Sequence, residues 1–467
     1  MEMILVGFVA AMALFFAVGL ASVKVAQRQV SDYLVAGRSV SPWAAGLSAV
    51  ASNNSGFMFI GAIGFTYSYG LAAFWLFFAW IGGDYVSWLI VHRRLRERSE
   101  AQNNDSVAGF LSHDGQGHVR GLQMVLGGLT VLFLTLYAAA QLKAGDKALG
   151  STLGWSPGTG IWLGTAMVAA YSFAGGIRAS IWTDIAQSFV MLVAMAALVW
   201  VCHTDIAPVG ELSSRLGAIE PSLLHWTPTD ASLGLLPYAL GWFIAGFGGV
   251  GQPHMIVRAM TVSSPEAIGT MRRVYFSWYI IFSVLTMAVG LYARVYFAGS
   301  ADLSFDKETA LPLLTGAHLA PIWVGFVLAG LFAATMSTAD SQVLAASASL
   351  TQDLFETQKK SYAASKVATL AVVSLATLAA FLGPASVFDL VTIAWGLMTT
   401  CFAPLMVARV LGWPVSTLSY VVAASAGMAA MLSWTHVFGL GDAVYDGAIG
   451  FCVAMPLLAL GARRLRA

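Results

Sequence analysis

The segment AATMSTADSQ, residues 333–342, gathers polar side chains within an otherwise apolar stretch. Ser337, Thr338 and Ser341 place three hydroxyl groups around the carboxylate of Asp340. On a helix of about 3.6 residues per turn, Ser337, Asp340 and Ser341 share one face and Thr338 lies beside it. Hydroxyl and carboxylate oxygens are hard ligands that replace the water around a small cation. The segment therefore predicts an ion site, unless the hydroxyls bond their own helix and Asp340 pairs with a distant lysine.

Two other segments predict breaks in apolar helices. Residues 52–56 read SNNSG, and serine and asparagine compete for backbone hydrogen bonds while glycine loosens the backbone. Residues 245–254 read AGFGGVGQPH, with four glycines and a proline, which indicates an unwound or kinked helix. Inside a membrane, such a break frees carbonyl groups for an ion and is tolerated only where it lines a cavity or is buried in protein. Close helix packing through small residues is the alternative explanation for both segments.

Carboxylates within apolar segments are costly in a membrane and commonly mark a pathway. Asp84, Asp184 and Asp340 occupy such segments, whereas Asp389 lies nearer a helix end. No residue in the sequence favours one role for Asp84 over another. The sequence has no HExxH motif, and its three cysteines and eight histidines show no metal-ligand spacing. These features argue against an enzyme embedded in the membrane.

The elements that position these residues must be membrane helices. The chain is 58% hydrophobic and 10% charged, with a mean hydropathy of +0.76, and this balance does not build a soluble surface. A helix that crosses a hydrocarbon layer of about 30 Å needs about 20 residues. Strands of alternating polarity are absent, so a helix bundle is expected rather than a barrel. We predict thirteen crossings, at residues 3–25, 41–68, 71–92, 121–145, 158–174, 180–202, 233–253, 274–297, 320–350, 364–382, 385–408, 414–434 and 441–462.

Basic residues predict the orientation, because cytoplasmic loops carry an excess of lysine and arginine. An odd number of crossings places the termini on opposite sides. With an external N-terminus, the basic residues on the outer side are Lys143, Lys147, Arg215, Arg294 and Lys307. All other lysines and arginines then fall on the inner side, so we predict a cytoplasmic C-terminus. The first span lacks a basic region before it and a small-residue cleavage site, so we expect a retained helix.

The two interrupted spans are the second and the seventh, five spans apart. This spacing is typical of two inverted five-helix repeats, whose broken helices hold ions and substrate in secondary transporters. A net charge of +1 gives no reason to expect a nucleic-acid partner. The expected partners are instead the lipid bilayer, a small solute and an ion.

At these residues the sequence resembles the sodium/solute symporter family, particularly its bacterial proline and pantothenate transporters. The likeness covers most of the chain, through SDYLVAGRS (31–39), SGFMFIGAIG (55–64), YSFAGGIRASIWTDIAQ (171–187), GQPHMIVR (251–258), AATMSTADSQ (333–342) and IAWG (393–396). It implies an all-α protein of the bacterial inner membrane with a leucine-transporter-like inverted repeat. The ten-helix core would occupy 41–408, after an extra helix and loop at 1–40 and before two C-terminal helices at 409–467.

The resemblance also implies site residues. A sodium ion would lie between the first and eighth core helices, bound by the carbonyls of Ala51, Asn54 and Ala334 and the hydroxyls of Ser337 and Thr338. A second ion, or a proton, would be held by Asp184, Asp340 and Ser341. The substrate would contact the two broken helices at Asn53, Ser55, Gly56, Ala245, Gly249 and Pro253. Apart from Na+ as the coupling ion no cofactor is expected, and one chain holding a complete site requires no protein partner.

Two departures from the family pattern bear on function. Asn53 stands where the proline carriers have an aspartate required for sodium coupling. Asp340 would then restore the missing charge, or Asp184 and Asp340 would carry a proton, because a carboxylate desolvated beside another binds protons more tightly. Ala245 and Gly249 stand where those carriers have a tryptophan and a tyrosine, so the pocket loses two aromatic walls that would hold a pyrrolidine ring.

We therefore predict a sodium-coupled symporter that imports a small organic solute by alternating access. The expected solute is a proline-like amino acid or a monocarboxylate. A proton-coupled symporter of the same fold is one alternative. A transporter-like sensor is another, and it differs because a pure sensor would not restore growth to an uptake-deficient strain.

Overall fold

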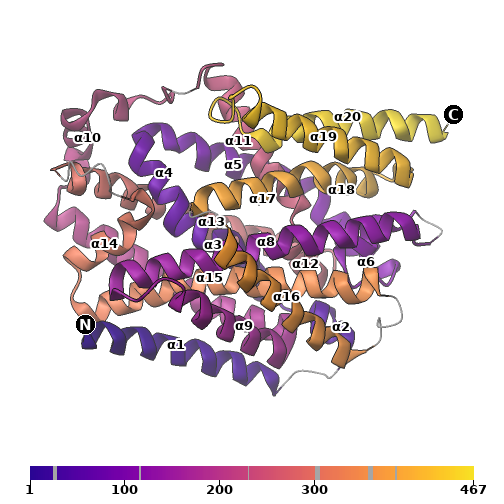
Figure 1. Ribbon diagram of the computed structural model, residues 1–467, viewed down its shortest axis with the longest axis horizontal. Coiled ribbons are helices and arrows are strands. Elements are labelled where there is room, and N and C mark those ends of the chain that lie inside the picture. The colour runs from indigo at the N-terminus through magenta and orange to yellow at the C-terminus, as the bar shows by residue number, and fades with distance from the viewer. Residues whose placement is uncertain are drawn as a thin grey trace.

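The computed structural model describes residues 1–24, 29–114, 117–229, 231–299, 306–355, 361–383 and 386–466. These ranges are helical apart from turns, loops and two isolated β-bridges, Val40 with Val262 and His113 with His118. The long helices run along the longest axis of the molecule, and the two termini lie at its opposite ends (Figure 1). Opposite ends are what an odd number of crossings requires.

The helices of the described ranges are joined by short 3-10 and π segments. The α-helices are α1 (Glu2–Val23), α2 (Val30–Val35), α3 (Pro42–Gly56), α4 (Ala62–Tyr69), α5 (Phe74–Ser87), α6 (Arg93–Ala101), α7 (Val107–Ser112), α8 (Arg120–Leu153), α9 (Thr159–Asp205), α10 (Val209–Ile219), α11 (Leu235–Phe247), α12 (Pro253–Thr261), α13 (Ala267–Tyr296), α14 (Ala310–His318), α15 (Pro321–Ser349), α16 (Tyr362–Leu382), α17 (Val387–Cys401), α18 (Ala403–Val410), α19 (Thr417–His436) and α20 (Asp446–Arg466). The short segments are η1 (Ala36–Arg38), η2 (Phe57–Gly61), η3 (Gly70–Ala73), η4 (Trp88–His92), η5 (Pro221–Leu224), η6 (Gly248–Gly251), η7 (Phe297–Gly299), η8 (Lys307–Thr309) and η9 (Leu350–Leu354).

The number of crossings stays a prediction. Within the described ranges, 10 helices are long and apolar enough to span a membrane. One of them, Pro42–Ala101, covers two of the predicted crossings, and two further crossings correspond to the shorter apolar helices Thr159–Ala170 and Leu235–Gly251. The predicted boundary between 158–174 and 180–202 appears as a kink within α9 at Gly176, where φ is 58°.

Both helix breaks lie in the segments where the sequence predicts them. α3 begins with Ser41 as N-cap, whose Oγ accepts from Ala44 N at 3.2 Å, and with Pro42 in its first turn. It loses helical geometry at Ser55 (φ 6°, ψ −179°) and continues as η2 and α4. α11 ends before the glycines of η6, and α12 starts after an extended residue, Gln252.

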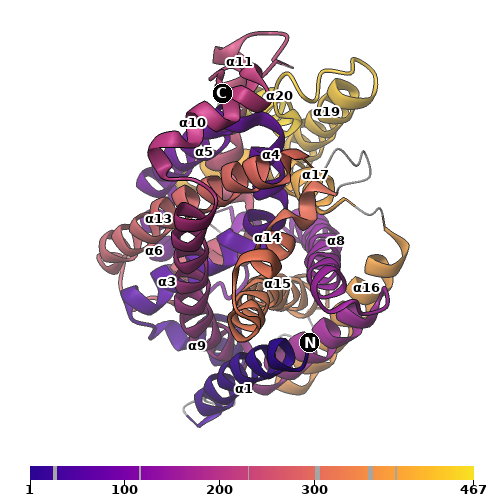
Figure 2. The same ribbon diagram turned by 90° about the vertical axis from the view of Figure 1, so that its left-hand side faces the viewer.

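α15 is the central helix of the bundle. Nearly all its side chains from Val324 to Ser349 are buried. It packs against α8, α9, α1 and α3, and the view along the bundle shows these helices around it (Figure 2). The polar segment of α15 is therefore enclosed by protein and does not face lipid.

α5 and α11 touch backbone to backbone through two glycines. A Cβ added at Gly83 would lie 1.8 Å from the carbonyl oxygen of Phe243, and one at Gly246 would lie 1.9 Å from that of Trp80. Neither position has room for any side chain. This contact fixes the position of Trp80, which enters the site described below.

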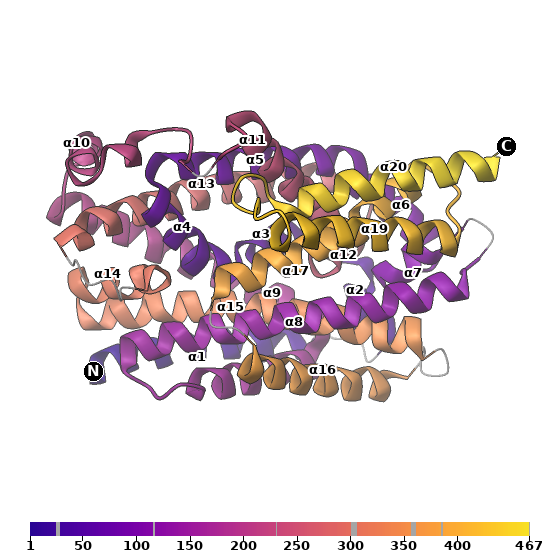
Figure 3. The same cartoon turned by 45° about the horizontal axis from the view of Figure 1, so that its top comes forward.

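Three arginines used to predict the orientation do not lie in loops. Arg96, Arg258 and Arg409 have 0%, 1% and 6% of their surfaces exposed and are packed among helices. Their positive charge serves internal contacts, which the loop assignment did not foresee. Arg28, Lys359 and Lys360, which also entered that prediction, lie outside the described residues. In Figure 3, α6, the start of α8 and the end of α20 lie toward the end of the bundle that holds the C-terminus.

We expect Gly246→Ala to separate α5 from α11. The new methyl group meets backbone rather than a flexible side chain, so overpacking should cost about 1–3 kcal/mol and lower the melting temperature of the purified protein. Gly128→Ala is the matched control, because no atom lies within 4 Å of its added Cβ, and its melting temperature should not fall. Equal stability of both variants would show that α5 and α11 do not pack through these glycines.

Candidate functional site

A buried carboxylate from α9 joins three helices. Asp184 accepts a hydrogen bond of 2.5 Å from Ser48 Oγ of α3, and a second hydrogen bond from Ser337 Oγ of α15. None of its surface is exposed. Because a buried carboxylate without partners is strongly disfavoured, these hydroxyl donors stabilise its position.

Arg258 of α12 provides the opposite charge. Its Nη2 lies 3.4 Å from Asp184 Oδ2. The same nitrogen donates to Ser180 Oγ at 3.2 Å and to Ser341 Oγ. We call Asp184, Arg258, Ser48, Ser337 and Ser341 the central polar cluster. The sequence analysis missed Arg258 in this role, although its position on the helix after the glycine-rich break was a usable signal.

One of the predicted ion-ligand hydroxyls contacts α3 just before its break. Thr338 Oγ1 donates to the carbonyl of Ser52 at 3.2 Å, and the hydroxyls of Ser52 and Ser341 lie 3.2 Å apart. The α15 segment and the last turn of α3 before Ser55 are thus in direct contact. Thr338 thus lies beside Ser52, whereas the Ser337 hydroxyl bonds Asp184, and the sodium-ligand set stays a prediction.

Asp340 faces a different group of residues. It accepts a hydrogen bond from Ser172 Oγ of α9, and Tyr33 donates its hydroxyl to the Ser172 carbonyl at 2.7 Å. No lysine or arginine of the described ranges forms an ion pair with Asp340. The alternative of a pairing with a distant lysine is therefore not found there. Asp184 of α9 accepts from hydroxyls of α3 and α15, whereas Asp340 of α15 accepts from a hydroxyl of α9.

Two of the quoted sequence motifs form one structural unit. Asp32 of α2 pairs with Arg178 of α9 at 2.5 Å, and Arg178 also donates to the carbonyl of Ala36 at 2.8 Å. A Cβ at Gly176 would lie 2.5 Å from the Tyr33 carbonyl oxygen. Glycine is required at this kink because φ is positive and because α2 approaches so closely. The unit holds α9 in place behind Asp340.

The N–H groups at the α3 break already have acceptors. Gly56 N donates to Gln141 Oε1 of α8 at 3.0 Å, and Phe57 N donates to Ser55 Oγ at 3.1 Å. In this arrangement these N–H groups are therefore not free to bind a substrate carboxylate. By contrast, the side-chain Nδ2 of Asn53, which is buried, has no hydrogen-bond partner among the described residues.

Asn53 lines a small aromatic cavity. The cavity measures about 10 Å³, which is room for about one water molecule, so a solute enters only if its walls move. Its walls are Asn53, Phe57, Met58, Leu76, Phe77, Trp80, Tyr137, Tyr279, Val391 and Trp395. Four helices that contribute walls, α5, α8, α13 and α17, were not connected with substrate by the sequence analysis. Aromatic residues in apolar spans cannot be told from ordinary core residues by sequence.

An aromatic ring from another helix lies beside Ala245 and Gly249. Trp395 of α17 donates its indole N–H to the Ala245 carbonyl at 2.8 Å. Its ring centroid lies 4.9 Å from that of Trp80. A Cβ at Gly249 would lie 4.0 Å from the Trp395 ring. The loss of two aromatic walls from α11 stays a prediction, and the aromatic walls of this cavity come instead from other helices, among them α5 and α17.

Pro253 lies in a separate cavity. This space, about 20 Å³, is also lined by Arg258, Ser341 and Asp105. Burial raises the pKa of the Asp105 carboxyl above its usual value, although Arg38, 3.6 Å away, acts in the opposite direction. The predicted substrate positions are thus not brought together around one space.

Asp84 accepts hydrogen bonds within the helix bundle. Its carboxylate binds the Tyr275 hydroxyl at 2.7 Å and the Ser87 hydroxyl at 3.2 Å. Only 2% of its surface is exposed, and a Cβ at Gly249 would lie 3.4 Å from its Oδ1. Asp84 therefore connects α5 to α13 directly behind the aromatic cavity.

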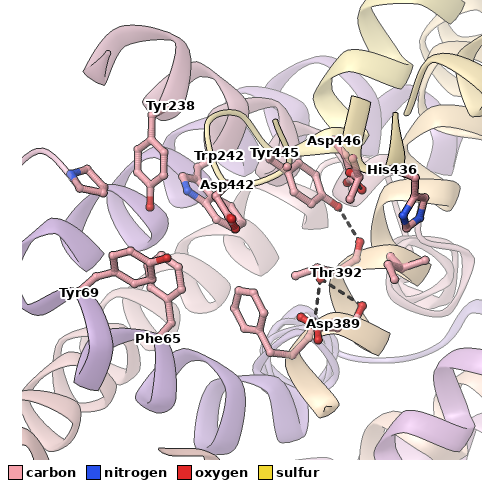
Figure 4. A pocket seen from close by; sticks show the side chains of 15 residues that line it. Phe65, Tyr69, Tyr238, Trp242, Asp389, Thr392, His436, Asp442, Tyr445 and Asp446 are labelled. Carbon is pink, nitrogen blue, oxygen red and sulfur yellow. Dashed lines mark hydrogen bonds between the residues drawn. The ribbon is translucent and has the colours of Figure 1, made fainter. Parts of the chain in front are cut away.

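The end of the bundle that holds the N-terminus is hollow. Two adjoining cavities of about 340 and 440 Å³ share Phe65, Tyr69, Phe388, Asp389 and Asp442 in their walls. Figure 4 shows the first of them. Phe388 stacks on Phe57 at 5.4 Å and on Phe65 at 5.6 Å. These rings separate the hollow from the aromatic cavity below it.

Known proteins share this sequence and architecture. The sodium:solute symporter family matches residues 33–414 of the chain. The chain is 29% identical over 434 residues to the high-affinity proline transporter PutP of Bacillus subtilis (strain 168), with 91% of each covered. It is 30% identical over 400 residues to the sodium/proline symporter of Staphylococcus aureus (strain JH9), covering 83% of this chain and 77% of that one.

A solved structure agrees with the fold. The substrate-bound, outward-open state of a Na+-coupled sialic acid symporter superimposes with a TM-score of 0.79 at 18% identity, covering 99% of this chain and 98% of that one. The architecture is the expected leucine-transporter-like helix bundle.

The chain belongs to the sodium:solute symporter family. It is a multi-spanning membrane transporter that couples solute movement to sodium, and its relatives are transporters rather than enzymes. Those relatives are consistent with a place in the bacterial inner membrane. The resemblance to the proline transporters is confirmed.

We expect Arg258→Met to destabilise the protein strongly. It leaves Asp184 buried without its counter-charge, which costs about 3–5 kcal/mol in free energy of unfolding. Adding Asp184→Asn should recover part of that loss, because no uncompensated charge remains. The measurement is a denaturant titration in detergent micelles.

Arg215→Met is the matched control for this prediction. It breaks an ion pair with Glu211 in which both side chains are at least half exposed, so the expected loss is only about 0–1 kcal/mol. If Arg258→Met cost no more than this control, or if Asp184→Asn added its own full penalty, the two buried charges would not compensate each other.

Proposed function

We propose that this symporter imports a small, proline-like amino acid together with sodium. The observation that supports the ion site is the hydrogen bond that the Thr338 hydroxyl gives to the Ser52 carbonyl, just before the break in α3. In the proposal, the carbonyls of Ala51, Asn54 and Ala334 and the hydroxyls of Ser337 and Thr338 bind the ion. Both hydroxyls donate hydrogen bonds here, and a hydroxyl that donates keeps lone pairs for a cation.

For the second ion or proton we propose Asp340 alone, rather than Asp184, Asp340 and Ser341 together. Arg258 already binds Asp184 and Ser341, so a second cation between these residues would have to displace a guanidinium group. Asp340 is free of that competition, and we propose it as the group that takes up a proton or a second ion. Asp340 also offers the anionic oxygen that Asn53 does not.

The substrate site is proposed in the aromatic cavity. Trp80 and Trp395 offer flat apolar faces to a small ring, and the buried Asn53 amide offers an N–H donor to a carboxylate. The cavity walls contain no charged side chain. A monocarboxylate is the second candidate substrate. It would use the same amide, and it is supported by the absence of an acidic side chain from these walls, because it carries no ammonium group that would need one.

In the proposed transport cycle, the end of the bundle that holds the N-terminus is the open end. The hollow at the N-terminal end would admit sodium and substrate, and the central polar cluster closes the other end by tying α3, α9, α12 and α15 together. Coupling requires only that ion and substrate favour the same conformation. With the N-terminus outside, each sodium ion gains about 2.3 kcal/mol per 100 mV on entry. We assign the cycle to 41–408, with 1–40 and 409–467 as flanking segments.

We expect sodium to raise the melting temperature of the purified protein relative to potassium at equal ionic strength. A ligand that binds only the folded state stabilises by RT ln(1 + [L]/Kd). Ser337→Ala with Thr338→Ala removes two proposed ligands and should abolish both this rise and sodium-driven uptake of labelled L-proline into proteoliposomes. Ser347→Ala is the control, because that hydroxyl bonds the Leu344 carbonyl at 2.9 Å and Thr369 of α16 at 3.1 Å, neither of which is a proposed ion ligand.

A sodium effect that survives in the double variant would place the ion elsewhere. If wild type showed no sodium effect, uptake driven by a proton gradient and lost in Asp340→Asn would establish the proton-coupled alternative. Binding without any uptake would favour the sensor.

We expect Trp395→Ala to raise the KM for L-proline roughly tenfold, equivalent to about 1.4 kcal/mol, because it removes one aromatic wall. Trp395→Phe should have a smaller effect, since the wall remains and only the hydrogen bond to Ala245 is lost. Trp162→Ala is the control, at a position whose side chain is 63% exposed on the outside of the bundle. An unchanged KM in Trp395→Ala would move the substrate out of the aromatic cavity.

A further inference from the structure

A pocket lies where α6, α7 and α18 end, toward the end of the bundle that holds the C-terminus. Figure 3 shows α6 and α7 toward that end. The pocket measures about 190 Å³, far more than one water molecule needs. Its walls include Arg98 of α6, Gln102 just after it, Phe110 of α7, Arg409 of α18 and Trp413 beyond α18. It shares no wall residue with the aromatic cavity.

Two guanidinium groups meet in this pocket. Arg98 Nη1 donates to the main-chain carbonyl of Arg409 at 2.6 Å, and Arg409 Nε donates to the Leu111 carbonyl of α7 at 2.8 Å. These hydrogen bonds connect the ends of α6, α18 and α7. They also bring two positive charges to one space, where the charges repel each other unless an anion lies between them.

Arg409 differs from the other deeply buried arginines because it has no ion pair. Arg96 pairs with Glu100 at 2.7 Å, and Arg258 pairs with Asp184 at 3.4 Å. Arg409 is 6% exposed, yet in the part of the chain that the structure describes it pairs with no carboxylate. A buried charge is costly without a counter-charge. An anionic ligand would supply the missing one.

One acidic residue, Asp114, also lines the pocket. Its Oδ1 accepts a hydrogen bond from Gly117 N at 3.0 Å. Leaving the histidine His113 aside, two arginines and one aspartate give the walls one excess positive charge. Asp114 therefore weakens the attraction of the pocket for an anion but does not cancel it.

The chemistry of the walls favours a phosphate group. A guanidinium group presents its N–H donors in a planar fork that matches two phosphate oxygens. Tryptophans such as Trp413 are typical of the level of lipid headgroups. With the predicted orientation, this end of the bundle meets the cytoplasmic leaflet, whose anionic lipids bind in basic pockets between membrane helices.

We propose that this pocket binds a phosphate group, and that an anionic phospholipid of the surrounding bilayer supplies it. Arg98 and Arg409 bind the phosphate oxygens, and the bound group holds the ends of α6, α7 and α18 together. The lipid as source depends on the predicted orientation, whereas the phosphate site does not. Neither depends on the proposed substrate or on sodium.

The test is a titration of short-chain phosphatidylglycerol into the whole purified protein in neutral detergent, with the melting temperature as readout. Short-chain phosphatidylcholine controls for the acyl chains, because its choline group cancels the phosphate charge. Phosphatidylglycerol should raise the melting temperature further and saturate, because it binds the folded protein. Arg98→Gln should raise the Kd about tenfold, and Asp114→Asn should lower it about threefold, because a repelling carboxylate is removed.

Arg93→Gln is the matched control. It makes the same charge change on the same helix, at a side chain that is 62% exposed, pairs with Glu266 and lies outside the pocket walls. Its Kd should stay within about twofold of wild type. Equal weakening in Arg93→Gln and Arg98→Gln would show attraction to general surface charge and reject the pocket. A Kd that does not fall in Asp114→Asn would also reject it, and a gain in affinity there cannot come from misfolding.

Inorganic phosphate distinguishes the two sources of the phosphate group. Potassium phosphate is compared with potassium chloride at equal ionic strength, for wild type and for Arg98→Gln. We expect phosphatidylglycerol to stabilise wild type at far lower concentrations than inorganic phosphate does. If inorganic phosphate alone raised the melting temperature and phosphatidylglycerol did no more than phosphatidylcholine, the lipid would be rejected as the source. If neither probe exceeded its control, the phosphate site itself would be refuted.

Discussion

A carboxylate buried at the centre of a membrane bundle must be compensated, and the structure depends on how Asp184 is compensated. Arg258 and the hydroxyls of Ser48 and Ser337 supply charge and hydrogen bonds from α12, α3 and α15. Each of these helices is thereby held to α9. Because a low-dielectric interior strengthens both the attraction and the penalty for breaking it, these contacts connect the four helices strongly.

The two helix breaks lie next to residues of this cluster. The break in α3 at Ser55 lies just beyond the residues that meet Thr338, and the break before α12 allows Arg258 to point into the bundle. Ion binding near Ser337 would compete with, or rearrange, the hydrogen bond that the same hydroxyl gives to Asp184. An ion bound there would thus be linked chemically to the contacts that join α3, α9, α12 and α15, and such a link is what coupling requires.

The aromatic cavity has aromatic walls although the neighbouring residues of α11 are small. Ala245 and Gly249 are small, and Trp395 takes the space beside them and bonds the Ala245 carbonyl. The close glycine contact between α5 and α11 brings Trp80 to the same place. A stack of rings then divides this cavity from an outer one of opposite character, rich in carboxylates. The two neighbouring spaces therefore differ in chemical character.

The sequence by itself determined the helical class, the membrane setting, both helix breaks and the positions of the α15 hydroxyls. These features depend on local composition and on spacing along one helix, which the chain displays directly. Only the tertiary structure decided that Arg258 is a buried partner of Asp184 rather than a loop residue, that Asp340 faces Ser172, and that Trp395 replaces the walls absent from α11. Each of these depends on which faces of distant helices meet, because a side chain's charge and shape leave open which of many possible partners is packed against it.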